Sequence, residues 1–144
     1  MKKHSALEIA RYVVSKCSFD KEPISNLQLQ KILYCLQTKF LKTSSALFDD
    51  KFEAWAFGPV VSEVYYQYCG FGAIPINMRH DIKLDLLDEE SLKIIDSIIV
   101  EKRSKEPWEL VDEVHKPGGA WERAYRARNR NYRTIDEDDM KKYS

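Results

Sequence analysis

Three histidines, at positions 4, 80 and 115, are the residues of this chain best suited to metal binding or proton transfer. His80 adjoins Asp81, and His115 lies two residues after Glu113, so each pair offers two ligand types that metal ions accept. Neither pair has a further His or Cys at the spacing typical of zinc sites. We therefore expect surface or hydrogen-bonded histidines, with no bound metal and no other cofactor.

Motifs for nucleophilic catalysis and phosphate binding are absent from the sequence. It contains no G-x-S-x-G element and neither a G-x-G-x-x-G nor a G-x-x-x-x-G-K-[ST] loop. The cysteines, Cys17, Cys35 and Cys69, fall in apolar helical patterns, where thiols are usually buried and inert. Paired carboxylates such as Asp49-Asp50 suit turns and helix N-termini better than acid–base catalysis. The sequence favours a protein that is not an enzyme.

An arginine-rich stretch from residue 123 to residue 133 is the best candidate for contact with nucleic acid. It holds five arginines and two tyrosines, which can contact phosphates and stack on bases. The same stretch could instead be a solvated arm that pairs with residues 81–113, where 11 acidic residues outnumber 5 basic ones. No helix-turn-helix or other reader module is evident, so we favour the solvated arm over nucleic acid.

The chain also carries more Trp and Tyr than a small core usually needs, and these types, with Arg, are enriched at binding hot spots. We expect Trp55, Tyr65 and Trp108 to fill the core. Tyr66 lies off the apolar stripe of its predicted helix and is a better candidate for an interface. The candidate partner-binding residues are Tyr66, Arg123, Tyr125, Arg126 and Arg128.

The composition is typical of a globular protein. A chain of 144 residues that is 44% apolar and 32% charged fits one domain over residues 1–144, and its zero formal charge demands neither nucleic acid nor membrane. The odd number of widely spaced cysteines argues against a disulfide framework. No apolar run reaches the roughly 18 residues of a membrane span, and no signal peptide is evident. We expect a cytoplasmic protein; the oligomeric state is not set by these features.

Hydrophobic periodicity predicts mainly helices. Ser5 and Glu8 can form a capping box for a helix over residues 5–17, and a second helix starts at Ser25 or Asn26. This second helix has the clearest apolar stripe, whereas its polar residues Gln30, Lys31, Gln37 and Lys39 fall largely off that stripe. Further helices are predicted from Asp88 to Arg103, before Pro117, around Trp121 to Tyr125, and from Asp136 to the end.

A small β-hairpin is predicted in the middle of the chain. Asp49-Asp50 can form its turn, because they separate two β-friendly runs, 46–48 and 51–55. Gly58-Pro59 follows, and Pro at a first helical position predicts that a helix begins there. Val60, Val61, Val64, Tyr65 and Tyr68 make the buried stripe of that helix. The expected fold class is mainly α (α+β), a single-domain helical bundle with a small β-hairpin.

Two long strings and three shorter ones resemble the Panacea domain family. The long strings are ISNLQLQKILY at 24–34 and FEAWAFGPVVSEVY at 52–65, and the shorter ones are YCGFGAIPI at 68–76, PGGAW at 117–121 and 135–140. Phe57 departs from the family pattern, in which tyrosine is commoner. The matching positions that we expect to be structural are Lys31, Tyr34, Trp55, Gly58, Pro59, Tyr65 and Trp121.

The resemblance implies a function. Proteins of this family are phage-associated or paired with unrelated toxins in bacterial and phage two-gene systems, so the resemblance implies an antitoxin that neutralises a cognate toxin by direct protein–protein binding. The alternative is a nucleic-acid-binding phage or prophage regulatory protein that uses residues 123–133. Which toxin would be bound, and by which face, does not follow from the sequence.

Overall fold

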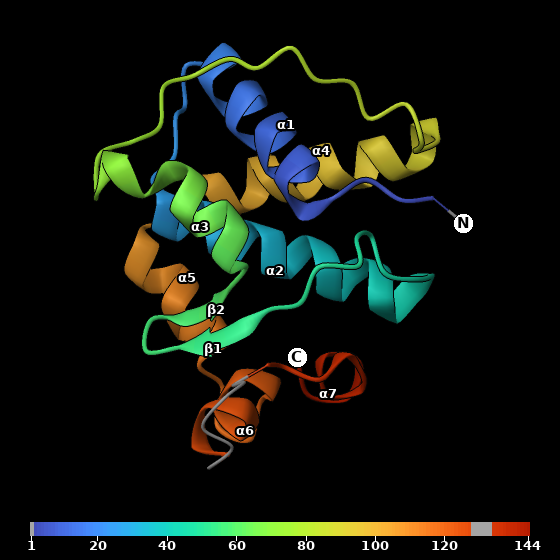
Figure 1. The fold of residues 1–144 in the computed structure, drawn as a ribbon, viewed down its shortest axis with the longest axis vertical. Coiled ribbons are helices and arrows are strands. Elements are labelled where there is room, and N and C mark those ends of the chain that lie inside the picture. The colour runs from blue at the N-terminus through green and yellow to red at the C-terminus, as the bar shows by residue number, and fades with distance from the viewer. Residues whose placement is uncertain (1, 128–133) are drawn as a thin grey trace.

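The computed structural model describes residues 2–127 and 134–144, and its central element is the helix α2 (Asn26–Thr43). Figure 1 shows α1 (Ala6–Phe19) and α4 (Glu89–Arg103) on one side of α2. On the other side lie the hairpin of β1 (Glu53–Trp55) and β2 (Gly58–Val60), α6 (Ala120–Arg126) and α7 (Glu137–Tyr143). Helix α2 contacts α1, α3 (Ser62–Tyr68), α4, α5 (Pro107–Val114), α7 and β2. One helix is therefore the common support for elements from both halves of the chain.

The first two helices begin as predicted because each carries its own start signal. Ser5 accepts a hydrogen bond from the Glu8 N–H while the Glu8 side chain accepts one from the Ser5 N–H, which completes a capping box for α1. Ser25 and Gln28 do the same for α2. Each pair satisfies backbone donors that have no partner inside the helix.

The hairpin lies later in the chain than predicted. Strand β1 (Glu53–Trp55) pairs antiparallel with β2 (Gly58–Val60), so the turn is formed by residues 56–57 and not by Asp49-Asp50. The Asp50 carboxylate instead accepts a hydrogen bond from the Ala6 N–H at 2.9 Å, at the start of α1. Asp50 therefore serves a contact with another element, which a local turn pattern does not reveal.

Gly58-Pro59 does not start a helix, contrary to the prediction. Both residues belong to β2, and helix α3 (Ser62–Tyr68) begins three residues after Pro59. Gly58 has φ +114°, far from helical geometry. The predicted apolar stripe survives in part, since Val64 and Tyr68 are buried while Tyr65 is half-buried. A short 3₁₀ turn, η1 (Cys69–Phe71), ends this segment.

The connection from η1 to α4, residues 72–88, passes over α1 (Figure 1) and is held there by hydroxyl groups. Ser18 donates to the Ile76 carbonyl at 3.1 Å, and Ser15 accepts from the His80 N–H at 2.7 Å. Ile76 also forms an isolated antiparallel bridge with Ile24. These contacts explain how a segment with no regular structure keeps its place on the helices.

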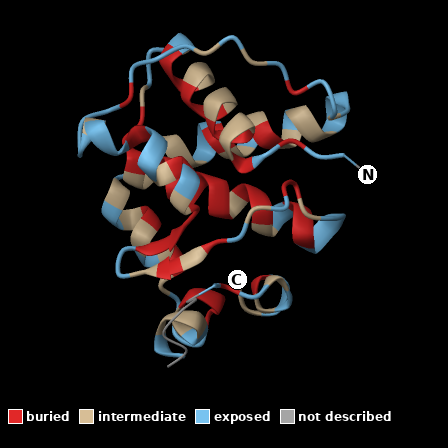
Figure 2. Ribbon diagram, viewed as in Figure 1, coloured by how far each residue is buried: buried red, intermediate tan, exposed pale blue. Residues whose placement is uncertain are grey.

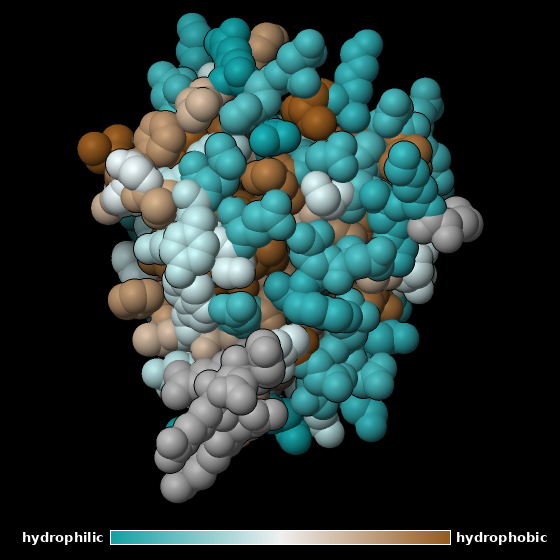
Figure 3. Space-filling view, viewed as in Figure 1, coloured by the Kyte–Doolittle hydropathy of each residue, from teal (hydrophilic) through white to brown (hydrophobic). Residues whose placement is uncertain are grey.

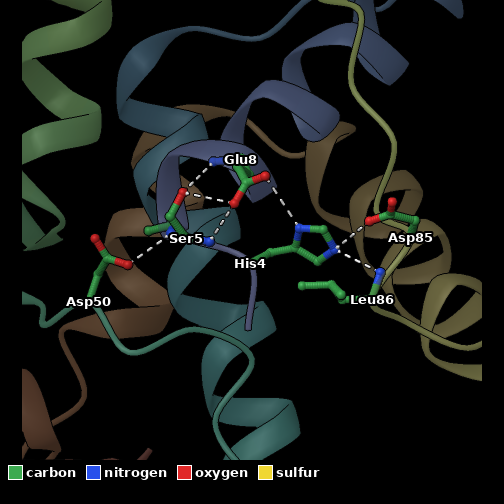
Figure 4. A network of polar contacts seen from close by, with 7 residues as sticks. His4, Ser5, Glu8, Asp50, Asp85 and Leu86 are labelled. Carbon is green, nitrogen blue, oxygen red and sulfur yellow. Dashed lines mark hydrogen bonds and ion pairs between the residues drawn. The ribbon is translucent and has the colours of Figure 1, made fainter. Parts of the chain in front are cut away.

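A second attachment of this connection is the buried His4 (Figure 4). Its Nε2 accepts a hydrogen bond from the Leu86 N–H at 3.0 Å, and its Nδ1 lies 3.5 Å from Glu8. The same Glu8 closes the capping box with Ser5. Asp88, two residues after Leu86, caps α4 as predicted by accepting a hydrogen bond from the Ser91 N–H at 2.8 Å.

The C-terminal part contains α5 (Pro107–Val114), α6 (Ala120–Arg126) and α7 (Glu137–Tyr143). Asp136 caps α7 as predicted, and its neighbour Ile135 and Met140 are both buried. Trp108 was expected in the core but exposes 64% of its surface, because α5 turns Leu110 and Val114 inward instead. Within the described residues, no helix is long and apolar enough to cross a membrane.

Buried residues from α1 to α7 form one cluster that runs along α2 (Figure 2). The fold class is mainly α (α+β), with a two-stranded antiparallel sheet, as predicted. Cys17 is buried as expected, whereas Cys35 is half-buried and Cys69, directly after α3, is exposed. Cys69 is exposed because it belongs to η1, where none of the residues is buried.

Candidate functional site

Lys31 is a fully buried cation at the middle of the fold. It projects from α2, and its amine donates a hydrogen bond to the Pro59 carbonyl oxygen in β2 at 2.9 Å. Burial lowers the pKa of Lys31 to about 7, because the charged amine is removed from water. This contact joins the two long strings that carried the family resemblance, which lie on different elements.

Gly58 gives Lys31 the space that it occupies. A Cβ atom at position 58 would lie 2.9 Å from Lys31 Cε and 3.0 Å from Val114 Cγ2. The φ of +114° is also one that side-chain-bearing residues rarely adopt. Both the local backbone and the neighbouring amine therefore require glycine here.

Two amide side chains of α2 attach the hairpin and α3 to that helix. Gln30 accepts from the Val61 N–H at 3.0 Å and donates to the Asn26 side chain at 3.1 Å. Asn26 in turn donates to the Tyr65 carbonyl at 3.1 Å. Since both amides are buried, the backbone from β2 into α3 is fixed on α2 by a connected polar network.

The expectation that the polar residues of α2 lie off its buried face was wrong for Gln30, Lys31 and Gln37, which are all buried. Gln37 donates to the Phe48 carbonyl at 2.8 Å and accepts from the Leu47 N–H at 2.8 Å. Each of these side chains forms a hydrogen bond with the backbone of a strand or loop. Such backbone groups need a partner when they are buried, and the small sheet does not supply all of them. Sequence reasoning missed them because such partners come from distant segments.

Trp121 holds the other strand of the hairpin. Its indole N–H donates to the Trp55 carbonyl at 2.7 Å. Its ring stacks on His115 at 3.8 Å between centroids and on Tyr125 at 4.8 Å. The hairpin is thus fastened at Pro59 from α2 and at Trp55 from α6.

His115 stacks on Trp121 and lies near Lys31, whereas the sequence predicted only a surface or hydrogen-bonded histidine at this position. Burial lowers its pKa, and the nearby Lys31 charge lowers it further. Its buried Nε2 has no hydrogen-bond partner among the described residues. Those residues also contain no group of three His, Cys, Asp or Glu side chains that could hold a metal ion.

The outer surface of the hairpin and α3 carries aromatic rings. Trp55 lies 4.9 Å from Tyr65 and 6.2 Å from Tyr66, measured between ring centroids, and the two tyrosines lie 5.5 Å apart. Phe57, in the turn, exposes 65% of its surface and Tyr66 exposes 64%. We call these four residues, Trp55, Phe57, Tyr65 and Tyr66, the hairpin face.

Trp55 and Tyr65 are half-buried, so the expectation that they fill the core was wrong in part. The Trp55 indole N–H donates to the Glu53 side chain at 2.8 Å, which fixes the ring at the surface. Tyr34, by contrast, is buried as expected of a structural position and packs edge-on against Phe52 at 5.2 Å.

Arg123 and Arg126, two of the three arginines that were predicted to contact a partner, lie on α6, apart from the hairpin face. Arg123 donates to the Gly118 carbonyl at 3.0 Å and lies over the Tyr143 ring at 3.6 Å. Arg126 is 77% exposed in its side chain and lies 3.8 Å from Glu122. Neither pairs with residues 81–113, so the predicted self-docking is not seen for these two residues.

Tyr125 connects α6 to the hairpin face indirectly. It stacks on Trp121, which bonds the Trp55 carbonyl, and the Trp55 ring contacts Tyr66. Arg128, the remaining predicted partner-binding residue, lies outside the described residues, and the nucleic-acid alternative for residues 123–133 stays a prediction.

The Lys31–Pro59 hydrogen bond and the Trp121–Trp55 hydrogen bond both join residues of one range that matches a known family. The chain belongs to the Antitoxin SocA-like, Panacea domain family, whose model matches residues 29–122. This range contains all seven positions that were predicted to be structural. Among individual proteins, the chain is similar to Antitoxin SocA of Caulobacter vibrioides (strain NA1000 / CB15N), with 31% identity over 129 residues. That match covers 81% of this chain and 68% of the relative. No solved structure matches the chain.

Proposed function

We propose that this protein is an antitoxin that neutralises a cognate toxin by direct protein–protein binding, and that the hairpin face is the centre of the contact. Family membership supports the antitoxin role. The observation that carries the choice of surface is the exposure of Phe57 and Tyr66 beside the Trp55 and Tyr65 rings. Tyrosine and tryptophan are the residue types that dominate binding energy at protein interfaces.

The surroundings of the hairpin face support this proposal. Lys31, Gln30 and Trp121 hold the backbone beneath it through hydrogen bonds of 2.7 to 3.0 Å. A surface that is already ordered loses little conformational freedom on binding, so more of the contact energy appears as affinity. In Figure 3, pale and tan side chains gather on the side of α3, α5 and the hairpin turn, while hydrophilic ones cover the opposite side.

A growth assay with the product of the neighbouring gene tests the antitoxin role. That gene is expressed from an inducible promoter alone and together with this protein. We expect growth arrest in the first case and rescue in the second. A neighbour that is harmless alone, or whose toxicity this protein leaves unchanged, would contradict the proposal.

Matched aromatic substitutions test the surface. Phe57→Ala and Tyr66→Ala should each weaken toxin binding, measured by co-purification and calorimetry, and the pair should abolish rescue. Phe19→Ala is the control, because Phe19 is a similarly exposed aromatic residue, at 69%, on the end of α1. Equal losses from Phe19→Ala and Phe57→Ala, with unchanged folding, would rule out the hairpin face as the centre of the contact.

A further inference from the structure

A cleft of about 500 Å³ opens between the second half of α2, α4, α5 and the end of α7. Its walls include the buried Tyr34 and the apolar side chains of Ile98, Val114 and Ala120. A volume of this size falls in the range that holds small-molecule ligands. None of the four residues of the hairpin face lines this cleft, so it is a separate surface.

Four lysines from three parts of the fold line the same cleft: Lys39, Lys42, Lys102 and Lys116. Within the described part of the chain, Lys39 and Lys116 form no ion pair and no side-chain hydrogen bond. Both are exposed at the edge of the cleft. They are therefore available to an anion that enters it.

The acidic residues of the lining do not balance these charges. Glu113 already pairs with Lys102 at 2.9 Å and also with Lys105, which lies outside the lining. Asp112 is the other acid, and it is exposed to solvent. Two acids and four amines leave the cleft with an excess of positive charge.

One end of the cleft already holds oxygen atoms. The Lys42 amine donates a hydrogen bond to the main-chain oxygen of Ser144, and the Tyr34 hydroxyl lies 2.5 Å from the Ser144 hydroxyl. A lysine amine and a tyrosine hydroxyl thus both contact Ser144, which is part of the cleft lining. The two unpaired lysines lie in the same lining.

We propose that this cleft binds a phosphorylated small molecule with an aromatic or apolar body, such as a nucleotide, with Lys39 and Lys116 contacting the phosphates. Lysine binds phosphate as a compact point charge, and the apolar wall suits the uncharged part of such a ligand. Cys35 also lines the cleft, and burial raises the pKa of its thiol to about 11. The thiol is therefore protonated near neutral pH, so Cys35 offers the cleft no thiolate nucleophile.

Calorimetry with two probes tests the proposal, at about 50 mM salt so that charge contacts are not screened. We expect ATP to bind the full chain with one-to-one stoichiometry and to raise its melting temperature. Inorganic pyrophosphate should bind more weakly, because it lacks the body that contacts the apolar wall. No binding of either probe at about 1 mM would overturn the proposal.

A pair of double variants assigns the site. Lys39→Gln with Lys116→Gln should weaken ATP binding at least about tenfold, since each substitution removes a charge-assisted contact. The control is Lys83→Gln with Lys93→Gln, which removes the same charge from exposed lysines outside the cleft. Equal weakening by both pairs would mean diffuse attraction to the surface and would also overturn the proposal. Because these lysines are exposed, circular dichroism should show unchanged folding, and the toxin proposal is unaffected by either outcome.

Discussion

The amine of Lys31 donates a hydrogen bond across 2.9 Å to the carbonyl oxygen of Pro59, and no salt bridge within the described residues accompanies it. A buried cation held by one carbonyl is costly, because desolvation disfavours the charged form. The amine nevertheless connects the central helix to the strand that bears the hairpin face. Burial of the charged amine therefore lowers the stability of the fold, whereas its hydrogen bond fixes the position of that strand.

The first prediction concerns the pH dependence of folding. The pKa of Lys31 is about 7 in the folded protein and 10.5 in the unfolded chain. Between these values the unfolded chain binds more protons, so the contribution of Lys31 makes stability rise with pH, by at most about 1.4 kcal/mol per pH unit. We expect the free energy of unfolding of the wild type to gain on that of Lys31→Met as pH rises from 7 to 9.5, in denaturant titrations.

The control for this prediction is Lys39→Met, an exposed lysine two turns along the same helix. Its stability should follow the wild type across the same pH range. The lowered pKa of His115 does not interfere, because a histidine pKa shifted down from 6.5 alters stability only below about pH 6.5. If the free energies of unfolding of the wild type and Lys31→Met changed in parallel with pH, the lowered pKa of Lys31 would be contradicted.

The second prediction is that Gly58→Ala destabilises the fold by about 2–4 kcal/mol. A left-handed backbone costs roughly 1–2 kcal/mol for a residue with a side chain, and the added methyl group would also overlap Lys31 Cε at 2.9 Å. Gly72→Ala separates the two effects, because Gly72 also has a positive φ, +57°, but no atom lies within 4 Å of the place that its added methyl group would take. Thermal unfolding of both variants should show the larger loss at Gly58; equal losses would mean that Lys31 moves aside at little cost.

The third prediction concerns the core. Leu33 is fully buried on α2, so Leu33→Ala should lower the free energy of unfolding by about 2–5 kcal/mol. Leu86→Ala is a suitable comparison, because Leu86 exposes 50% of its surface and its contact with His4 uses only the backbone N–H. Denaturant titration of the two variants should therefore differ by more than 1 kcal/mol, roughly the margin expected between core and surface sites. Similar losses would contradict the central position of α2.

The starts of α1, α2 and α4 could be predicted because their signals are local. Ser5 with Glu8, Ser25 with Gln28, and Asp88 each lie within four residues of the backbone groups that they satisfy. The hairpin could not be placed in the same way. Its position depends on Lys31 beneath Gly58, and on the use of Asp50 by the start of α1, both of which join residues far apart in the sequence.

Of the predicted partner-binding residues, Tyr66 alone belongs to the hairpin face. The family positions Lys31, Gly58, Pro59 and Trp121 do converge on the hairpin, but their contacts with one another are invisible to periodicity. Trp108 was misplaced because an eight-residue helix has a narrow buried face, and one stripe of Leu110 and Val114 fills it. Gln37 lies four residues from both Leu33 and Leu41, and a polar residue flanked in this way by apolar ones is a signal that could have indicated a buried hydrogen-bond network.

The last prediction tests how α6 supports the hairpin. Trp121→Phe keeps an aromatic ring between His115 and Tyr125 but removes the indole N–H that the Trp55 carbonyl accepts at 2.7 Å. An unpaired acceptor of this kind costs about 1–3 kcal/mol, so we expect a loss of stability in that range. Amide hydrogen exchange should also become faster in β1 and β2 than in α1, because only the hairpin loses an attachment.

Trp108→Phe is the control for this prediction. It changes the same chemical group at an exposed position and should leave both measurements almost unchanged. Uniformly faster exchange in α1 and the hairpin would show instead that Trp121 stabilises the whole fold and not the hairpin in particular.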